Sequence, residues 1–176
     1  GFGMKTGLTP EDALVCYAAR KLGRPVRWRG ERSEEFLAAH MGRDQHVKAS
    51  LALDREGRIL AMRTVALANI GAVPVGSSAI IPLQLTPKVQ TTVYRVPAVH
   101  YRVQAVLTHT MATGAYRGAG RPEANFLMER LMEKAAREMK LDPVELRRRN
   151  LIRPDDMPYR THLGDIYDSG DFARML

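Results

Sequence analysis

Residues 46–68 read HVKASLALDREGRILAMRTVALA, and this stretch decides which class of fold the chain adopts. Its first part places apolar side chains at every second position, at Val47, Ala49, Leu51 and Leu53. A period of two is typical of a strand with one buried face. Residues 54–57 (DREG) supply a turn, and residues 59–68 return as a second strand. The sequence therefore predicts a β-hairpin.

A helix is predicted before the hairpin. Thr9 is a suitable N-cap, Pro10 fits the first helical position, and Gly23 can end the helix. Apolar residues recur with helical spacing, and we expect the stripe to be buried: Val15, Ala18, Ala19 and Leu22.

The longest helix is predicted over residues 123–140, after a loop at 108–120. Its apolar stripe consists of Ala124, Leu127, Met128, Leu131, Ala135 and Met139. Asp142 and Pro143 are typical of the start of one more helix.

Shorter elements complete the order. We expect a strand at 25–28, a helix at 33–40 and a strand at 99–107. Residues 69–90 carry little charge and should pack beneath something larger, and the polar residues after 153 should form a wrapping tail. Because strands and helices do not alternate strictly, the expected class is α/β of the α+β kind, with mixed sheets and packed helices.

Composition excludes several protein classes. The chain has 176 residues, of which 45% are hydrophobic and 26% charged, which argues against disorder. A single cysteine, Cys16, excludes a disulfide scaffold within the chain. We find no apolar run long enough for a membrane span and no signal peptide. The chain begins Gly-Phe-Gly, so we expect a piece of a longer protein.

The net charge of +8 raises the alternative of a basic RNA-binding module. The basic residues are spread along the chain, with one tight run at residues 147–149, and aromatic residues make up only 6%. We therefore expect this run to be a solvated helix face or a subunit contact, and we expect no nucleic-acid partner.

Two glycine-rich stretches could carry chemistry: residues 1–5 (GFGMK) and residues 114–123 (GAYRGAGRPE). Each precedes a helix, where N–H groups without an intrahelical partner favour anions. Arg117 and Arg121 add permanent positive charge. Taken alone, each stretch is also compatible with a plain turn before a helix.

A second alternative is a nicotinamide-dependent oxidoreductase of the short-chain type. Residues 113–120 match its TGxxxGxG pattern, and Tyr17 and Lys21 have the spacing of its catalytic pair. The order argues against it, since in that family the glycine loop precedes the pair and here it follows.

Taken together, the two stretches resemble the molybdenum hydroxylases, the family of xanthine dehydrogenase, aldehyde oxidase and carbon monoxide dehydrogenase large subunits. Residues 1–5 resemble the second half of that family's GGGFGxK motif, and residues 115–123 resemble its AYRGAGRPE loop. Further similar stretches are residues 19–26, 30–32, 146–152 and 167–172. The resemblance covers essentially the whole chain, so residues 1–176 are expected to be an incomplete part of the molybdopterin-binding domain.

The resemblance implies a set of site residues and partners. Cofactor-binding residues would be Gly1, Phe2, Gly3, Arg117, Gly118 and Ala119, with Arg117 also catalytic. Molybdenum would be held by molybdopterin, expected in its cytosine dinucleotide form, and by no protein side chain. An iron–sulfur small subunit with [2Fe-2S] clusters and an FAD-binding medium subunit would be partners in the cytoplasm.

Departures from the family pattern bear on the substrate. Gly118 stands where carbon monoxide dehydrogenases proper carry the cysteine that bridges to copper. Ala119 stands where xanthine-type enzymes carry a stacking Phe, and Thr6 where they carry a Glu. The expected activity is hydroxylation of an aldehyde or a (hetero)aromatic compound, with water as the oxygen source.

The family's general base belongs to a motif that this sequence lacks. Glu123 is explained by the dipole at a helix start, and His109 is expected to be structural. The isolated piece is accordingly predicted to be inactive.

Overall fold

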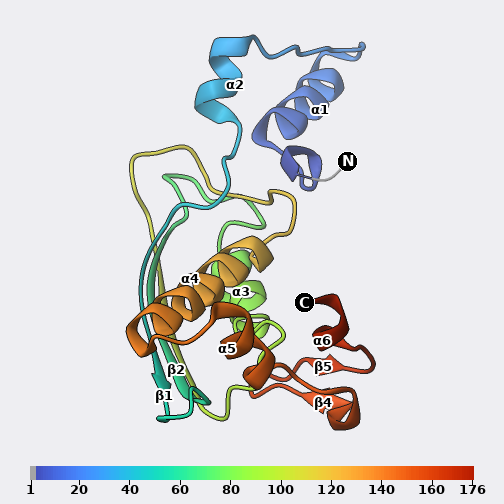
Figure 1. Cartoon of the computed structure of the whole chain (residues 1–176). Helices are drawn as coiled ribbons and strands as arrows, with labels where there is room; N and C mark the ends of the chain where they lie inside the picture. Colours follow the sequence, from blue (N-terminus) through green and yellow to red (C-terminus); the bar gives the residue numbers. More distant parts are fainter. Residues whose placement is uncertain (1–2) are drawn as a thin grey trace.

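We describe the computed structural model of the chain, which covers residues 3–176. Figure 1 shows α1 and α2 beyond one end of the sheet, while α4 packs against the sheet, α5 lies beside α4, and β4, β5 and α6 lie farther from the sheet. In chain order the elements are η1 (Gly3–Lys5), α1 (Pro10–Leu22), α2 (Arg32–Ala38), β1 (Gln45–Leu53), β2 (Ile59–Asn69), the π-helical turn η2 (Ile81–Leu85), α3 (Thr86–Lys88), β3 (Val99–Val106), α4 (Arg121–Met139), α5 (Pro143–Asn150), η3 (Pro154–Asp156), β4 (Tyr159–Arg160), β5 (Ile166–Tyr167) and α6 (Phe172–Met175).

The main sheet has three strands in the order β1-β2-β3. β1 and β2 form the predicted antiparallel hairpin, whereas β3 lies parallel to β2. A parallel pair needs a crossover connection, and the segment with η2 and α3 supplies it. The mixed α/β class predicted from the sequence is confirmed.

The core lies between the sheet and α4. Its largest fully buried side chains include Met62 of β2 and Met128 and Met132 of α4. The predicted α4 stripe omitted Met132 and Ala136, which are also buried. The inward residues of β1 alternate with exposed ones along the whole strand, as the period of two predicts.

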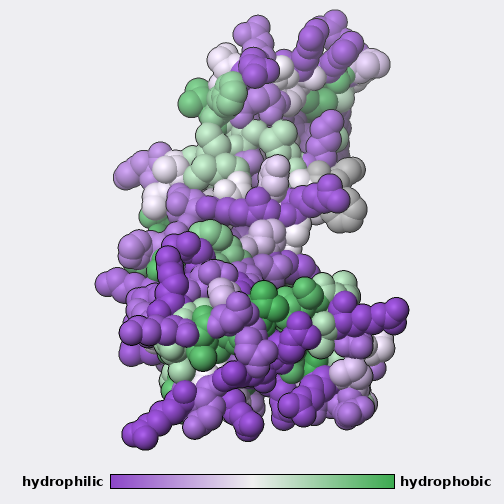
Figure 2. Space-filling model, viewed as in Figure 1, coloured by the Kyte–Doolittle hydropathy of each residue, from purple (hydrophilic) through white to green (hydrophobic). Residues whose placement is uncertain are grey.

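Helix α1 begins and ends where the sequence predicts, but the expected burial of its stripe was wrong. Thr9 and Asp12 form a capping box, and Gly23 adopts a left-handed φ of 64°. None of the residues of α1 is buried, and Leu22 is 57% exposed. Capping is decided locally, whereas burial needs a packing partner, which residues 3–176 do not give this helix. Figure 2 shows apolar side chains at the surface in this part of the molecule.

Residues 25–28 form no strand, contrary to the prediction. A strand needs a neighbour to satisfy its backbone groups, and this segment pairs with none of the described strands.

The polar tail after residue 153 contains secondary structure that the sequence analysis did not predict. It contains the two-stranded β4–β5 ladder, and the Tyr167 hydroxyl donates a hydrogen bond to the Thr92 carbonyl at 2.7 Å.

Segment 69–90 is covered only in part. Its second half carries buried Ile81, Thr86 and Gln90, and α3 of this half contacts α4. In its first half Val73 remains 73% exposed. Within residues 3–176, no helix has both the length and the apolar character that crossing a membrane would require.

Arg147 does not lie on a solvated face, so this expectation was wrong. Its side chain is 14% exposed and contacts Glu129 and Glu133 of α4, each at 2.8 Å. The Tyr94 hydroxyl donates to Glu129 at 2.6 Å, and burial together with the Glu129 charge raises the pKa of Tyr94. Arg147 thus joins α5 to α4.

Candidate functional site

The second glycine-rich stretch forms the loop between β3 and α4. Its last turn holds three consecutive residues with positive φ: Gly118 at 99°, Ala119 at 40° and Gly120 at 92°. At Gly120 a side chain is also excluded by space, because a Cβ atom would lie 2.6 Å from the Thr86 hydroxyl and 3.0 Å from the Thr86 nitrogen. These residues allow a tight backbone turn directly before α4.

The structure places Gly3, the first described residue of the first glycine-rich stretch, against this loop. A Cβ atom built on Gly3 would lie 3.5 Å from the carbonyl oxygen of Ala115, which is van der Waals contact. Gly1 and Phe2, predicted to bind the cofactor, lie outside the described residues. Two segments more than a hundred residues apart in the sequence therefore meet at Gly3 and Ala115.

The predicted residues of the loop present polar groups to solvent. Arg117 and Gly118 are exposed and Ala119 is half-buried. Within residues 3–176, the backbone N–H groups of Tyr116, Arg117 and Gly118 have no hydrogen-bond partner, and neither has the Arg117 guanidinium. By contrast, the Ala115 N–H donates to the Ser77 hydroxyl at 3.1 Å and the Ala119 N–H to the Tyr116 carbonyl at 2.8 Å. Free N–H groups beside an arginine suit a ligand with negatively charged oxygens.

A segment just before β1 runs along the base of this loop. The Met41 N–H donates to the Ala112 carbonyl at 2.9 Å, and Met41 in turn accepts from the Gly114 N–H at 2.7 Å. Gly42 packs so closely that a Cβ atom there would lie 2.8 Å from the Tyr116 Cβ.

Arg43 ends this segment and contacts the loop directly. It donates from Nη2 to the Arg117 carbonyl at 2.6 Å, and its guanidinium carbon lies 4.5 Å from the Tyr116 ring centroid. The sequence analysis missed Arg43. Its neighbour Gly42 was the only available signal, and one glycine before an arginine is not specific.

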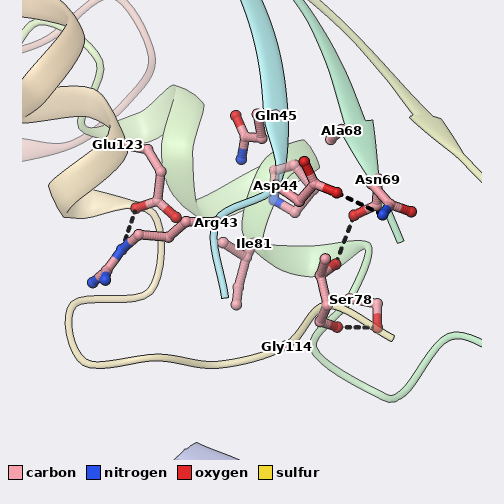
Figure 3. Close-up of a pocket in the computed structure, with 11 residues that line it drawn as sticks. Arg43, Asp44, Gln45, Ala68, Asn69, Ser78, Ile81, Gly114 and Glu123 are labelled. Atoms are coloured by element: carbon pink, nitrogen blue, oxygen red, sulfur yellow. Dashed lines mark hydrogen bonds and ion pairs between the residues drawn. The ribbon is translucent and has the colours of Figure 1, made fainter. Parts of the chain in front are cut away.

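A small polar pocket lies behind the loop (Figure 3). Glu123 points into it and its Oε2 atom is 3.7 Å from Arg43 Nε, but among residues 3–176 this buried oxygen has no hydrogen-bond partner. Asp44 accepts from the Asn69 amide at 2.7 Å, and the Ser78 hydroxyl donates to the Thr113 carbonyl. Glu123 thus does more than interact with the helix dipole.

Tyr101, near the Glu123 end of the loop, is a neutral hydroxyl at neutral pH. Burial raises the pKa of Tyr101 to about 12, with a further contribution from the Glu123 charge, so its hydroxyl stays protonated at neutral pH. That hydroxyl contacts the Pro82 carbonyl at 3.3 Å. His109 is exposed in the loop after β3. In the described part of the chain, no group of three or more His, Cys, Asp or Glu side chains could hold a metal ion.

Residues 1–151 match the family model of the molybdopterin cofactor-binding domain. The chain belongs to this family. The chain is 36% identical over 98% of its length to the 6-hydroxypseudooxynicotine dehydrogenase complex subunit gamma of Paenarthrobacter nicotinovorans. It is 35% identical over its full length to the carbon monoxide dehydrogenase large chain of Hydrogenophaga pseudoflava.

Solved structures agree with these matches. Quinoline 2-oxidoreductase from Pseudomonas putida 86 superposes with a TM-score of 0.92 at 38% identity, over 99% of this chain. The chain spans 22% of the length of that protein and of both relatives. Neither a nicotinamide-dependent oxidoreductase nor an RNA-binding module finds support in these comparisons.

Proposed function

We propose that this chain is part of the catalytic large subunit of a molybdenum hydroxylase, which hydroxylates an aldehyde or a (hetero)aromatic compound with oxygen from water. The contact between Gly3 and Ala115 carries the proposal, because it joins the two motifs that would flank the cofactor. All 176 residues would belong to the molybdopterin-binding part of that subunit.

The residues present fit such a cofactor. Gly118 and Gly120 adopt φ values that side chains disfavour, so the backbone can approach a ligand closely. The free N–H groups of residues 116–118 are donors for oxygen atoms, and Arg117 supplies a fixed positive charge. We assign cofactor binding to Gly1, Phe2, Gly3, Arg117, Gly118 and Ala119. When bound, the molybdenum–pterin group supplies the two-electron redox chemistry.

Arg117 has the catalytic role in this proposal. Its guanidinium is exposed beside the free N–H groups and supplies a positive charge and several donors. There it would stabilise negative charge that develops on an oxygen atom during the reaction, as preorganised donors do. The pterin would carry a cytosine dinucleotide, and electrons would leave through [2Fe-2S] clusters and FAD on an iron–sulfur small subunit and an FAD-binding medium subunit.

The loop favours an organic substrate over carbon monoxide. Gly118 offers no thiolate to bridge copper, although a carbon monoxide dehydrogenase large chain is among the relatives. Ala119 leaves space where a stacking Phe would stand in a xanthine-type enzyme. The likeness to quinoline 2-oxidoreductase supports a nitrogen-containing aromatic ring as one substrate class.

Isotope labelling of the full-length protein tests this function. The purified protein is incubated in H2¹⁸O with quinoline, with an aromatic aldehyde, or with carbon monoxide, together with an artificial electron acceptor. We expect ¹⁸O in the product of at least one of the two organic substrates and no oxidation of carbon monoxide. Molybdenum-loaded protein that oxidises only carbon monoxide, or that inserts oxygen from O2, would refute the proposal.

A further inference from the structure

We propose that Arg43 is a positioning residue that fixes the direction of the Gly118 N–H, and thereby aims one donor of the loop at the bound cofactor. This inference rests on the proposed function, since it takes the loop at residues 115–120 to be the cofactor-facing one. Arg43 belongs to neither glycine-rich stretch and lies 74 residues before the loop that it contacts.

Arg43 uses its guanidinium in three ways at once. Nη2 donates to the Arg117 carbonyl at 2.6 Å, the planar group lies over the Tyr116 ring at 4.5 Å, and Nε faces Glu123 at 3.7 Å. The ring and the carboxylate both attract the guanidinium, and together they limit the orientations in which it donates to the carbonyl. The side chain is 35% exposed, which keeps these contacts partly shielded from water.

The planar peptide bond carries this constraint to Gly118. In a trans peptide the carbonyl oxygen of one residue and the N–H of the next point in opposite directions. Holding the Arg117 carbonyl towards Arg43 therefore turns the Gly118 N–H away from Arg43. Within residues 3–176 this N–H has no acceptor, and Gly118 is exposed. The Gly118 N–H is thus a donor whose direction is fixed, and an acceptor atom of a ligand can bind in front of it.

The backbone around Arg43 supports this role. Arg43 itself adopts a left-handed φ of 62°, which costs a residue with a Cβ atom about 1 kcal/mol. The hydrogen bonds of Met41 with Ala112 and Gly114 hold the segment in place despite that cost. The guanidinium thus reaches the loop from a backbone that these two hydrogen bonds hold.

The test uses the full-length, molybdenum-loaded protein and three variants. Arg43→Ala removes all three contacts, whereas Arg43→Lys keeps the charge and one donor but loses the planar group. Arg95→Ala is the matched control, because Arg95 is also a half-exposed arginine, paired with Asp156 at 3.2 Å away from the loop. The measurements are molybdenum per chain, thermal midpoint, the molybdenum(V) electron paramagnetic resonance spectrum after dithionite reduction, and hydrogen exchange of the Ala119 amide.

We expect Arg43→Ala to keep its molybdenum and to have a thermal midpoint close to that of Arg95→Ala. Its resonance spectrum should shift in g value, and its Ala119 amide should exchange about tenfold faster, the effect of losing one charge-assisted hydrogen bond that holds the loop. Arg43→Lys should recover part of both changes. Arg95→Ala should show neither change.

Two results would overturn the inference. If Arg43→Ala has the unchanged spectrum and exchange rate of Arg95→Ala, Arg43 does not position the loop. If it loses stability and molybdenum together and Arg43→Lys restores nothing, the role of Arg43 is structural only. If instead the unmodified protein, produced in a host that makes molybdopterin, contains no molybdenum, the proposed function itself has failed.

Discussion

Arg43 Nη2 lies 2.6 Å from the carbonyl oxygen of Arg117, and this bond ties the segment before β1 to the loop before α4. Gly3 reaches the same loop at Ala115 from another part of the chain. The Ala115 N–H also donates to the Ser77 hydroxyl at 3.1 Å, so hydrogen bonds from two other segments hold the loop while Arg117 itself stays exposed. A loop fixed in this way can present its free groups without rearranging when a ligand binds.

The turn before α4 should not accept a side chain at Gly120. Gly120→Ala would combine a φ of 92° with a contact of 2.6 Å to the Thr86 hydroxyl. We expect the free energy of unfolding of the full-length protein to fall by about 2–4 kcal/mol, or an equivalent loss of soluble protein. Gly76→Ala is the control, since that position has open space and no left-handed φ. Equal stability of the two variants would show that the turn differs from the one described.

Arg147 should matter for stability, although it stands in a run of three arginines. Arg147→Ala removes two ion pairs and leaves Glu129 and Glu133 without their shared cation. We expect a loss of about 2–3 kcal/mol in urea unfolding, because the arginine is largely buried while both carboxylates are partly exposed. Its neighbour Arg148 is exposed, and Arg148→Ala should change stability by less than about 0.5 kcal/mol. Matching urea midpoints for the two variants would contradict this account.

The full-length protein should contain no functional copper. A copper bridge needs a soft thiolate, and Gly118 offers none. Elemental analysis should therefore find copper far below molybdenum, and cyanide treatment should release no copper. One copper per molybdenum, with carbon monoxide oxidation that disappears on its removal, would be evidence against this assignment of Gly118.

The isolated 176-residue chain should hold no molybdenum. It spans 22% of its relatives, and apolar side chains of α1 and α2 such as Leu14, Tyr17 and Leu37 are more than 60% exposed in it. We expect another part of the full-length protein to cover these side chains and Val73. Metal analysis of the purified chain should find no molybdenum, and one molybdenum per chain would contradict the prediction.

Local signals predicted much of the fold. Alternation gave the β1–β2 hairpin, and the Thr9 cap and Asp142-Pro143 gave the starts of α1 and α5, because hydrogen bonds close in sequence decide these features. Which side chains are buried depended instead on contacts between elements that are distant in the sequence. Arg147 looked solvated because its carboxylate partners lie on another helix, 14 and 18 residues away.

One part of the candidate site could be predicted from the sequence, and another part depended on tertiary packing. The glycine-rich stretches could be found from their composition, because positive φ and close backbone approach favour glycine. The contact of Arg43 with the loop could not, since it depends on how the segment before β1 packs against the loop after β3.

The most direct test of the site is the kcat of Arg117→Ala in the full-length protein at full molybdenum loading. We predict a fall of roughly 10²–10³-fold, the usual effect of losing one preorganised donor, with little recovery in Arg117→Lys. Arg148→Ala, which changes an exposed arginine outside the loop, should stay within about twofold of the unmodified protein. If Arg117→Ala and Arg148→Ala have the same kcat while both carry a full complement of molybdenum, Arg117 is a surface arginine and the loop is not the catalytic site.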